Sequence, residues 1–499
     1  MHYEKAGRVE YALLSFLYGL FGLSVILLIW QIIVPQPINV PGITIDRLSA
    51  SITLLVAGVG AVSYRFALRY LDGEPRQQQF LRWLAFTVAS AYILMPATNL
   101  LLLFSVWLLT SFGLHQLLTF YQERSEAFPP ARKKFLISRL GDVALLAAIG
   151  LIGLGWGTLD LHVFLSRVTE SGVWPFTPTV VALLIVTAAL TKSAQFPFHS
   201  WLPETMEAPT PVSALMHAGI INAGGVLLLH FAPLLVTVPV ALLMLAFVGT
   251  LTAMLGLLAM WAQTNIKRSL AWSTVSQMGF MMLQFGMAAF PAAILHLLGH
   301  GCYKAWSFLR TGDLPRHSPT PPTSPMRSVV MGILGTLIAV PALWLGVLIT
   351  GFDPFQSPGK FALTFIVALA IGQVWIAIFR TPTYATSNTL SGSVIALITT
   401  VVVAIFALGL YQGAEIFYMP VWGEVPIATG PVAWAAAALP ILGFTFMVTL
   451  YTLLPIFSRT AMGRAFYVHA IHGFYFGAIA DRLVERIWNN FAVRRVEHA

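Results

Sequence analysis

Fourteen apolar runs of roughly twenty residues set the limits on what this chain can fold into. A helix needs about 20 mostly apolar residues to cross the hydrocarbon core of a bilayer. Only 9% of the residues are charged and 58% are hydrophobic, whereas soluble domains carry about 25% charged residues. The sequence therefore predicts an all-α polytopic membrane protein with about fourteen transmembrane helices, and it excludes a soluble enzyme or a disulfide-built module. The runs are 11–34, 47–67, 80–96, 99–120, 135–155, 176–195, 209–231, 236–260, 268–287, 291–310, 329–351, 361–380, 392–412 and 432–456.

The basic residues give the expected orientation. The net charge of +9 arises from 28 Lys and Arg against 19 Asp and Glu, but the basic residues flank the apolar runs, so no nucleic acid partner is expected. With fourteen crossings, 23 basic residues fall on the side of both termini and three, Arg47, Arg167 and Lys360, on the other. The positive-inside rule then places both termini in the cytoplasm. The first run is long and has no small-residue cleavage site, so no cleavable signal peptide is expected.

A single cysteine, Cys302, excludes an internal disulfide, a Cys-cluster zinc site and an all-cysteine iron–sulfur centre. The chain also has no glycine fingerprint for a dinucleotide. We therefore expect no metal and no cofactor in this chain, and any chemistry to lie in a partner.

Several ionisable residues lie inside apolar runs, where a charge costs about 2.5–3.5 kcal/mol on insertion scales. Three of them, His296, His300 and Lys304, are spaced i, i+4 and i+8, which lines them along one helix face. We interpret these three residues as a polar stripe on an ion pathway. Haem ligation by a histidine of this stripe would need a pairing between helices that the sequence does not show. The residues are Asp142, Lys192, His217, His230, His296, His300 and Lys304.

Each of the isolated residues also has a simpler interpretation. Asp142 can pair with Arg139 near the cytoplasmic boundary, and Lys192 can extend its ammonium group to the interface. His230 is best explained as a hydrogen-bonded packing residue.

A proline-rich segment, residues 196–211, separates the sixth and seventh runs. Its prolines interrupt helical hydrogen bonding, which is tolerated at membrane depth only beside protein or water. A cytoplasmic re-entrant loop would explain the same pattern, but Lys192 directly before the segment favours a broken helix on an ion pathway. The residues expected to form this broken helix are Pro197, Pro203, Glu204 and Glu207.

Two further segments lie outside the runs. The proline-rich residues 311–328 are predicted to be a cytoplasmic linker. Residues 457–499 place apolar side chains at helical spacing between charged ones, which predicts one or two amphipathic helices against lipid or a partner.

Three stretches, residues 192–218, 263–279 and 296–304, resemble the antiporter-like subunits of respiratory complex I and of multisubunit cation/proton antiporters. The resemblance runs from about residue 44 to 310. It implies that Lys192 is the central proton-carrying lysine, that His217 and His300 relay protons and that Lys304 leads to the exit. Asp142 matches an acidic position of the family motif. Together with the predicted linker and tail, it divides the chain into four parts: 1–310 with the proton pathway, the linker 311–328, diverged helices 329–456 and the tail 457–499.

The chain also departs from this family. The family has a glutamate directly after the tryptophan of the fourth run, and this chain has Leu108 after Trp107. His115 lies on nearly the same face and is either a substitute or a packed polar residue. Beyond residue 328 the second lysine motif of the family is not recognisable.

The chain is shorter than typical members of this family. Its length and residues 218–225 and 467–475 are most similar to the DabB group, the membrane subunits of bacterial inorganic-carbon accumulation complexes. This resemblance implies a bacterial inner-membrane location and a soluble cytoplasmic partner, DabA-like, which resembles a carbonic anhydrase and carries zinc. Two alternatives stay open. The chain could be a proton-translocating subunit of a complex I-type enzyme or a multisubunit antiporter, or a scaffold whose polar row is inherited and inactive.

Overall fold

The structure is a computed structural model, and it describes residues 7–121, 123–170, 178–312, 325–380, 389–423 and 428–497. The first part contains α1 (Arg8–Ile33), β1 (Ile38–Val40), β2 (Ile43–Ile45), α2 (Arg47–Tyr70), α3 (Gln77–Leu94), α4 (Leu100–Leu118), η1 (Ser125–Ala127), α5 (Phe128–Trp156), α6 (Leu161–Glu170), α7 (Pro178–Lys192), η2 (Leu202–Glu207), α8 (Thr210–Ala218), η3 (Ile220–Asn222), α9 (Ala223–His230), α10 (Ala232–Val236), α11 (Pro239–Ala262), α12 (Ile266–Gly286) and α13 (Phe290–Leu309). The second part contains α14 (Pro325–Thr350), α15 (Pro358–Arg380), α17 (Thr389–Tyr418), η4 (Met419–Val421), α18 (Pro431–Phe457), α19 (Ala461–Ile471), η5 (Gly473–Tyr475) and α20 (Phe476–Glu497).

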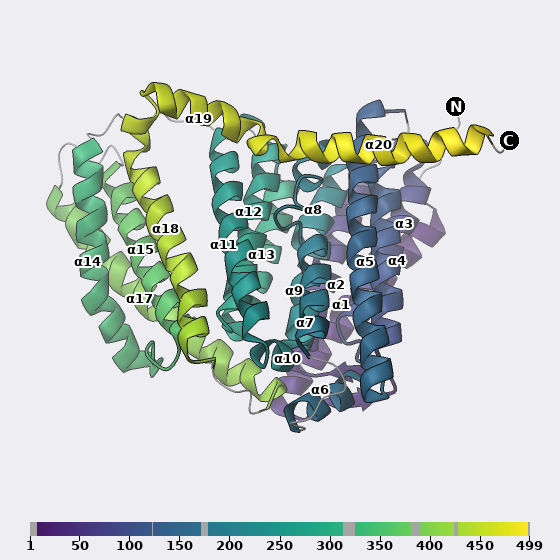
Figure 1. Cartoon of the computed structure of the whole chain (residues 1–499), viewed down its shortest axis with the longest axis horizontal. Coiled ribbons are helices and arrows are strands. Elements are labelled where there is room, and N and C mark those ends of the chain that lie inside the picture. The colour runs from purple at the N-terminus through teal and green to yellow at the C-terminus, as the bar shows by residue number, and fades with distance from the viewer. Residues whose placement is uncertain are drawn as a thin grey trace.

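The all-α membrane architecture is confirmed, since every predicted run coincides with a helix or, for 209–231, with the pair α8 and α9. Among the described residues, ten helical segments are long and apolar enough to cross a membrane. The other four predicted runs are α3, α7, α12 and α13. α7 is an apolar helix of only 15 residues, and the other three contain polar side chains that lower their mean hydropathy. Both termini lie on the same face of the bundle (Figure 1).

A short β-hairpin, which the apolar runs do not indicate, connects α1 and α2. Its strands β1 and β2 pair antiparallel, with Asn39 opposite Thr44. The turn contains Pro41 and Gly42, and Gly42 has a φ of 78°, a conformation that glycine adopts without steric cost. The hairpin lies on the face of the bundle away from the termini.

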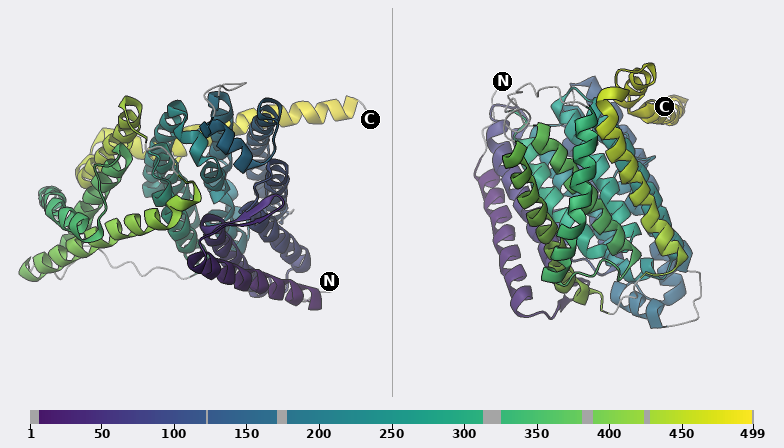
Figure 2. Two further views of the ribbon diagram at one scale, coloured as in Figure 1. Left: turned by 90° about the horizontal axis from the view of Figure 1, so that it is seen from below. Right: turned by 90° about the vertical axis from the view of Figure 1, so that its left-hand side faces the viewer.

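The membrane helices form two groups that stand side by side (Figure 2). We call α1 to α13 the first group and α14 to α18 the second group. The first group contains most of one large hydrophobic core, to which Ala414 and Tyr418 of α17 also belong. The helices α14, α15 and α17 enclose a smaller core. A third cluster, with Ala253 and Leu283 from the first group and Ala362 and Ala437 from the second, joins them.

The predicted amphipathic tail is α19 and α20, which cross the face that carries the termini (Figure 1). Residues 313–324, most of the predicted linker 311–328, lie outside the described residues, as does Lys5 of the charge count.

Candidate functional site

Lys192 is the last residue of α7, at the point where this helix breaks. The helix is 15 residues long, which corresponds to about 22 Å, so it ends within the bundle. Ala194 has a φ of 48°, and the Phe196 backbone N–H donates to Thr252 Oγ1 at 3.0 Å. The Thr252 side chain of α11 thus satisfies one of the freed backbone groups, as a break at membrane depth requires. The predicted broken helix is present.

Trp107 on α4 connects Lys192 to Asp142 on α5. The Lys192 Nζ donates to the Trp107 carbonyl oxygen at 3.3 Å and lies 4.2 Å from the centre of its ring. The Trp107 Nε1 donates to Asp142 at 2.8 Å, and the other Asp142 oxygen lies 2.6 Å from Arg139. Lys192 is only 8% exposed. Asp142 therefore pairs with Arg139 and is also linked to Lys192, so the four residues form one cluster.

Two close helix approaches hold this cluster together. A Cβ at Gly141, next to Asp142 on α5, would lie 2.1 Å from Thr191 Oγ1 on α7, next to Lys192. A Cβ at Gly224 would lie 2.4 Å from the hydroxyl of Ser193, which donates to the Ile221 carbonyl at 2.7 Å. Only glycine permits these contacts, so α5 and α9 both reach the broken end of α7.

Leu108, at the position of the missing glutamate, is partly buried and packs against the apolar core. His115 lies two turns further along α4, and its ring centre is 5.7 Å from that of Phe135. No described contact joins His115 to Lys192, so the structure agrees with a packed polar residue at this position. Lys192 instead contacts Trp107 directly, and Trp107 links it to Asp142.

The second part of the polar row lies between α8 and α13. Lys304 is fully buried, and its Nζ donates to Ser273 Oγ at 2.7 Å and to the Leu270 carbonyl at 3.3 Å. The His217 ring stacks on Phe308 with 4.3 Å between centres. His217 and His300 are buried, and within the described residues both nitrogens of each ring lack a hydrogen-bond partner. Such buried nitrogens have the capacity to bind water or a proton.

His300 interacts electrostatically with both His217 and Lys304, so α8 and α13 bring three of the predicted pathway residues together. His296, on the same face of α13, is half-buried, with its ring 5.9 Å from that of His300 and 5.1 Å from that of Phe280. The predicted stripe is therefore a continuous face of α13 that points into the first group at His300 and Lys304.

A second helix break, which the sequence analysis did not predict, lies beside this stripe. The run 209–231 divides at Gly219, and the Asn222 Nδ2 donates to the freed carbonyl of Ala218 at 2.8 Å. A Cβ at Gly301 of α13 would lie 2.8 Å from the same carbonyl. The break and the close approach of α13 thus occur one residue after His217.

His230 has the role that its simpler interpretation predicts. Its Nε2 forms a hydrogen bond to the Met95 carbonyl oxygen at 2.9 Å. Nothing in this contact connects it to the polar row.

Glu204 and Glu207, expected on the broken helix, lie on η2 at the face under α20. Glu207 pairs with Arg124 at 2.7 Å, and Glu204 with the fully buried Lys133 at 2.6 Å. Lys133 lies at the same distance from Asp481 of α20. Burial raises the pKa of the Glu204 carboxyl, although the Lys133 ammonium group opposes this shift. Pro203 is the second residue of this 3-10 helix, and Pro197 lies in the non-helical stretch between α7 and η2.

Aromatic contacts add to the attachment of the tail. The Phe476 ring packs edge-on against Phe196 with 4.7 Å between centres, and Arg132 lies 4.9 Å from the centre of the Trp488 ring. The opposite side of α20 exposes an apolar stripe of Ile479, Leu483 and Ile487, which are 42–54% exposed. The tail thus joins the broken helix on one side and presents apolar surface on the other.

Lys133 and Lys134 directly precede the predicted run 135–155, and the charge pattern counts them only among the basic residues on the side of both termini. α5 begins at Phe128, seven residues before the predicted run, so both lysines lie within the helix and are buried. The eight-residue spacing of Lys134 and Asp142 places them on one face of α5 and is the signal that could have identified this.

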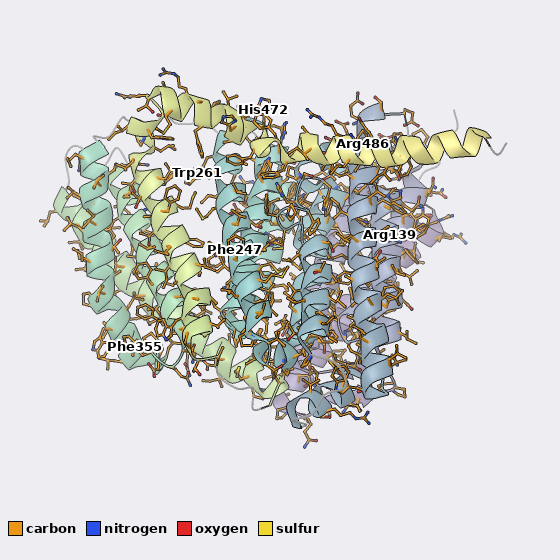
Figure 3. All side chains as sticks on the ribbon, in the orientation of Figure 1. Arg139, Phe247, Trp261, Phe355, His472 and Arg486 are labelled. Atoms are coloured by element: carbon orange, nitrogen blue, oxygen red, sulfur yellow. The ribbon has the colours of Figure 1, made fainter. Side chains whose placement is uncertain are left out.

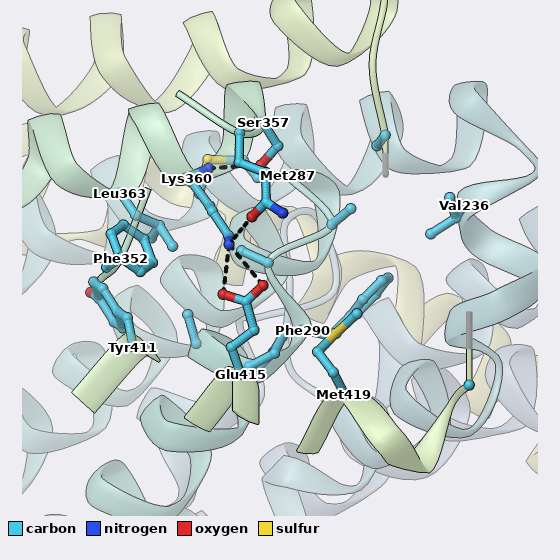
Figure 4. Close-up of a pocket in the computed structure, with 17 residues that line it drawn as sticks. Val236, Met287, Phe290, Phe352, Ser357, Lys360, Leu363, Tyr411, Glu415 and Met419 are labelled. Atoms are coloured by element: carbon cyan, nitrogen blue, oxygen red, sulfur yellow. Dashed lines mark hydrogen bonds and ion pairs between the residues drawn. The ribbon is translucent and has the colours of Figure 1, made fainter. Parts of the chain in front are cut away.

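The second group has one prominent polar contact. Lys360 of α15 lies 2.6 Å from Glu415 of α17 and also contacts Gln356. They line a cavity of about 330 Å³ together with side chains such as Phe352 and Tyr411 (Figure 4). This pair lies at the helix ends away from α20, and the sequence analysis recorded only Lys360, as a basic residue of that side.

Within the described residues, no group of three His, Cys, Asp or Glu side chains is arranged to hold a metal ion.

The comparisons with known proteins agree with this architecture. The family described as "NADH:quinone oxidoreductase/Mrp antiporter, TM" matches residues 97–379. The "Probable inorganic carbon transporter subunit DabB2" of Halothiobacillus neapolitanus is 35% identical over 458 residues, which cover 89% of this chain and 80% of the relative. The chloroplastic "NAD(P)H-quinone oxidoreductase subunit 5" of Chloranthus spicatus is 35% identical over 305 residues, 59% of this chain and 41% of the relative.

A solved structure shares the fold. A chain of the Mrp complex from Dietzia sp. DQ12-45-1b superimposes with a TM-score of 0.54 and 23% identity, covering 98% of this chain and 59% of that one. The likeness extends across both helix groups.

Proposed function

Since the chain belongs to the family of NADH:quinone oxidoreductase and Mrp antiporter membrane subunits, we propose that it conducts protons or sodium ions to drive the accumulation of inorganic carbon. It is a transporter subunit in this proposal, not an enzyme. The conversion of carbon dioxide to bicarbonate takes place in a soluble DabA-like partner that carries zinc. This chain itself holds no cofactor.

The observation that carries the cation pathway is the position of Lys192 at the broken end of α7. A lysine is expensive to bury in a membrane protein and is retained where it serves an ion pathway. Asp142 and Trp107 hold it on one side, and His217, His300 and Lys304 continue the buried polar row through α8 and α13.

The choice of inorganic carbon rests on the extent of the similarity to the carbon transporter subunit. That alignment covers 89% of the chain, whereas the alignment to the quinone oxidoreductase subunit covers 59%. Each elementary charge that crosses a potential of ~100 mV supplies about 2.3 kcal/mol. A few charges per turnover would bias the hydration of carbon dioxide strongly toward bicarbonate.

The same proposal assigns an orientation. The excess of basic residues on the side of both termini supports a cytoplasmic position for them, in the inner membrane of a bacterium. α19 and α20 then face the cytoplasm, and their exposed apolar stripe is the docking surface for the soluble partner.

The test is co-expression of this chain with the protein from the neighbouring reading frame in a bacterium that lacks carbonic anhydrase and needs added carbon dioxide to grow. The expected result is growth in air and accumulation of labelled inorganic carbon, both abolished by an uncoupler. Accumulation that persists in the uncoupled cells, or that needs this chain but no partner, would contradict the proposal.

A complex I-type function is the second candidate, because the quinone oxidoreductase subunit is 35% identical over 59% of this chain. Purification in mild detergent separates the two. One large zinc-containing protein is expected with the tagged chain, whereas several flavin and iron–sulfur subunits would favour the second candidate.

A further inference from the structure

Lys134 is a second buried lysine beside Lys192 that the pathway described above does not use. It lies in the second turn of α5 and is 4% exposed. Its Nζ donates to the Ser111 carbonyl at 2.8 Å and to the Ser111 hydroxyl at 3.0 Å, both on α4. These acceptors are neutral, so its positive charge is solvated by dipoles and not by a carboxylate.

The two lysines reach α4 on successive turns. Lys192 approaches the carbonyl of Trp107 from α7, and Lys134 approaches that of Ser111 from α5. Residues four apart on a helix are separated by about 6 Å along its axis, and the two ammonium groups interact electrostatically. The two lysine side chains therefore lie next to each other along one face of α4.

The charges around this pair do not compensate for two ammonium groups. Asp142 and Arg139 on α5 face the pair, and they neutralise each other across 2.6 Å. His115 on α4 is the remaining titratable group that interacts with Lys134, and it adds no negative charge. A second positive charge in this buried cluster would be opposed both by burial and by the charge already present.

We propose that Lys134 and Lys192 share one excess proton, and that Lys134 is the group through which Lys192 exchanges protons with the face under α20. This proposal rests on the proposed cation pathway and names a further member of it. The transfer breaks an Nζ–H bond on one lysine and forms one on the other, so the pair keeps a charge of +1. The Ser111 hydroxyl, which both donates and accepts, lies directly beside Lys134 as a relay.

The position of Lys134 fits this role. α5 starts at the face that α20 crosses, and Lys134 lies two turns nearer to that face than Asp142 (Figure 1). In Figure 3 Arg139 lies on α5 well below α20, so Lys134 lies between this cluster and the surface. Because position 108 carries leucine, no glutamate at that position holds the proton on Lys192, and repulsion between two ammonium groups favours a single proton on the pair.

The experiment measures proton flux with the full chain and its partner in proteoliposomes, using an internal pH-sensitive dye and an imposed potential. Lys134→Gln removes the titratable group, and Lys134→Arg keeps the donors but holds its proton permanently. We expect both variants to insert, to retain the partner and to conduct at least about tenfold less than wild type. His230→Ala, outside the polar row, is the control and is expected to conduct at close to the wild-type rate.

Wild-type flux in Lys134→Gln would overturn the proposal. So would full flux in Lys134→Arg, because that result would assign Lys134 a structural hydrogen-bonding role only. If neither variant inserts, Ser111→Ala decides, since it removes one oxygen and no charge: a decrease of about threefold or more supports the relay, and an unchanged flux contradicts it. Absence of both proton and sodium ion flux in the wild-type complex would instead contradict the proposed function itself.

Discussion

The first and second helix groups have similar apolar character but place their charged residues differently. In the first group, Lys134, Asp142, Lys192, His300 and Lys304 are buried along their helices. In the described helices of the second group, each charged side chain lies within four residues of a helix end; these are Arg327, Lys360, Arg380 and Glu415. The second group demonstrates that apolar packing alone suffices to build such helices. Buried charges are costly in a membrane protein, so those of the first group agree with the proposed ion pathway.

The difference extends to the backbone. In the first group, α7 ends at Lys192 and the next run divides at Gly219, and both breaks lie beside titratable side chains. The helices α14, α15, α17 and α18 of the second group are each described as one continuous α-helix of 23 residues or more. Broken helices and buried charges occur together, which is the pattern of an ion pathway.

The largest effect is expected at Lys192. Lys192→Ala removes the titratable group at the broken helix, and we expect inorganic carbon accumulation and growth in air to fall by about 100-fold or more, while insertion and partner binding remain. The measurement is uptake of labelled inorganic carbon in the co-expression strain. Normal uptake by this variant would eliminate the central role of Lys192.

Loss of the tail is expected to have the next largest effect. Truncation after Ser458 removes α19 and α20, with their exposed apolar stripe and the Asp481 contact to Lys133. We expect retention of the partner to decrease about tenfold or more, because hot-spot residues carry most of the binding energy at an interface.

Detergent extraction followed by pull-down of the truncated chain measures this retention, and protease accessibility checks that the membrane helices are still inserted. Full retention would show that the tail contacts lipid and not the partner. Docking would then shift to the loops between the helices on the same face.

An intermediate effect is expected on α13. Lys304→Ala and His300→Ala each remove one buried group from the row, and a water can partly replace it. We expect flux to decrease about tenfold, equivalent to ~1.4 kcal/mol in a barrier. His230→Ala is the matched control, because this histidine is hydrogen-bonded to Met95 outside the row. Equal losses at all three positions would indicate general damage to the fold.

The smallest effect is expected in the second group. The double variant Lys360→Met, Glu415→Gln removes both charges of a partly exposed pair, so no unpaired charge remains. Such pairs contribute about 0–1 kcal/mol to stability, and we expect flux to change less than about twofold. A loss comparable to that of Lys192→Ala would extend the pathway into the second group.

Much of the architecture could be predicted from the sequence, because the apolar runs determine where helices cross. The burial of the α5 lysines was missed, although the spacing of Lys134 and Asp142 is a signal for it. The hydrophobic run starts at 135, but the helix starts at Phe128, and the burial of Lys133 and Lys134 depends on partners from η2, α4 and α20. The role of Trp107 was also missed, because its carbonyl and its indole N–H link Lys192 and Asp142, which are distant from it in the sequence.

The break at Gly219 was missed for a related reason. Residues 209–231 are predominantly apolar, and Asn222, the polar side chain that compensates for the break, resembles an isolated substitution in such a run. In contrast, the break after Lys192 could be predicted, since prolines mark it in the sequence.

We propose that cations cross this protein through the first helix group at Lys192. The most direct measurement is potential-driven proton flux in proteoliposomes that contain the purified chain with its partner, compared among wild type, Lys192→Ala and the double variant Lys360→Met, Glu415→Gln. We expect wild-type flux in the double variant and flux at the level of protein-free liposomes in Lys192→Ala. Flux in Lys192→Ala equal to that of wild type would contradict a cation path through Lys192.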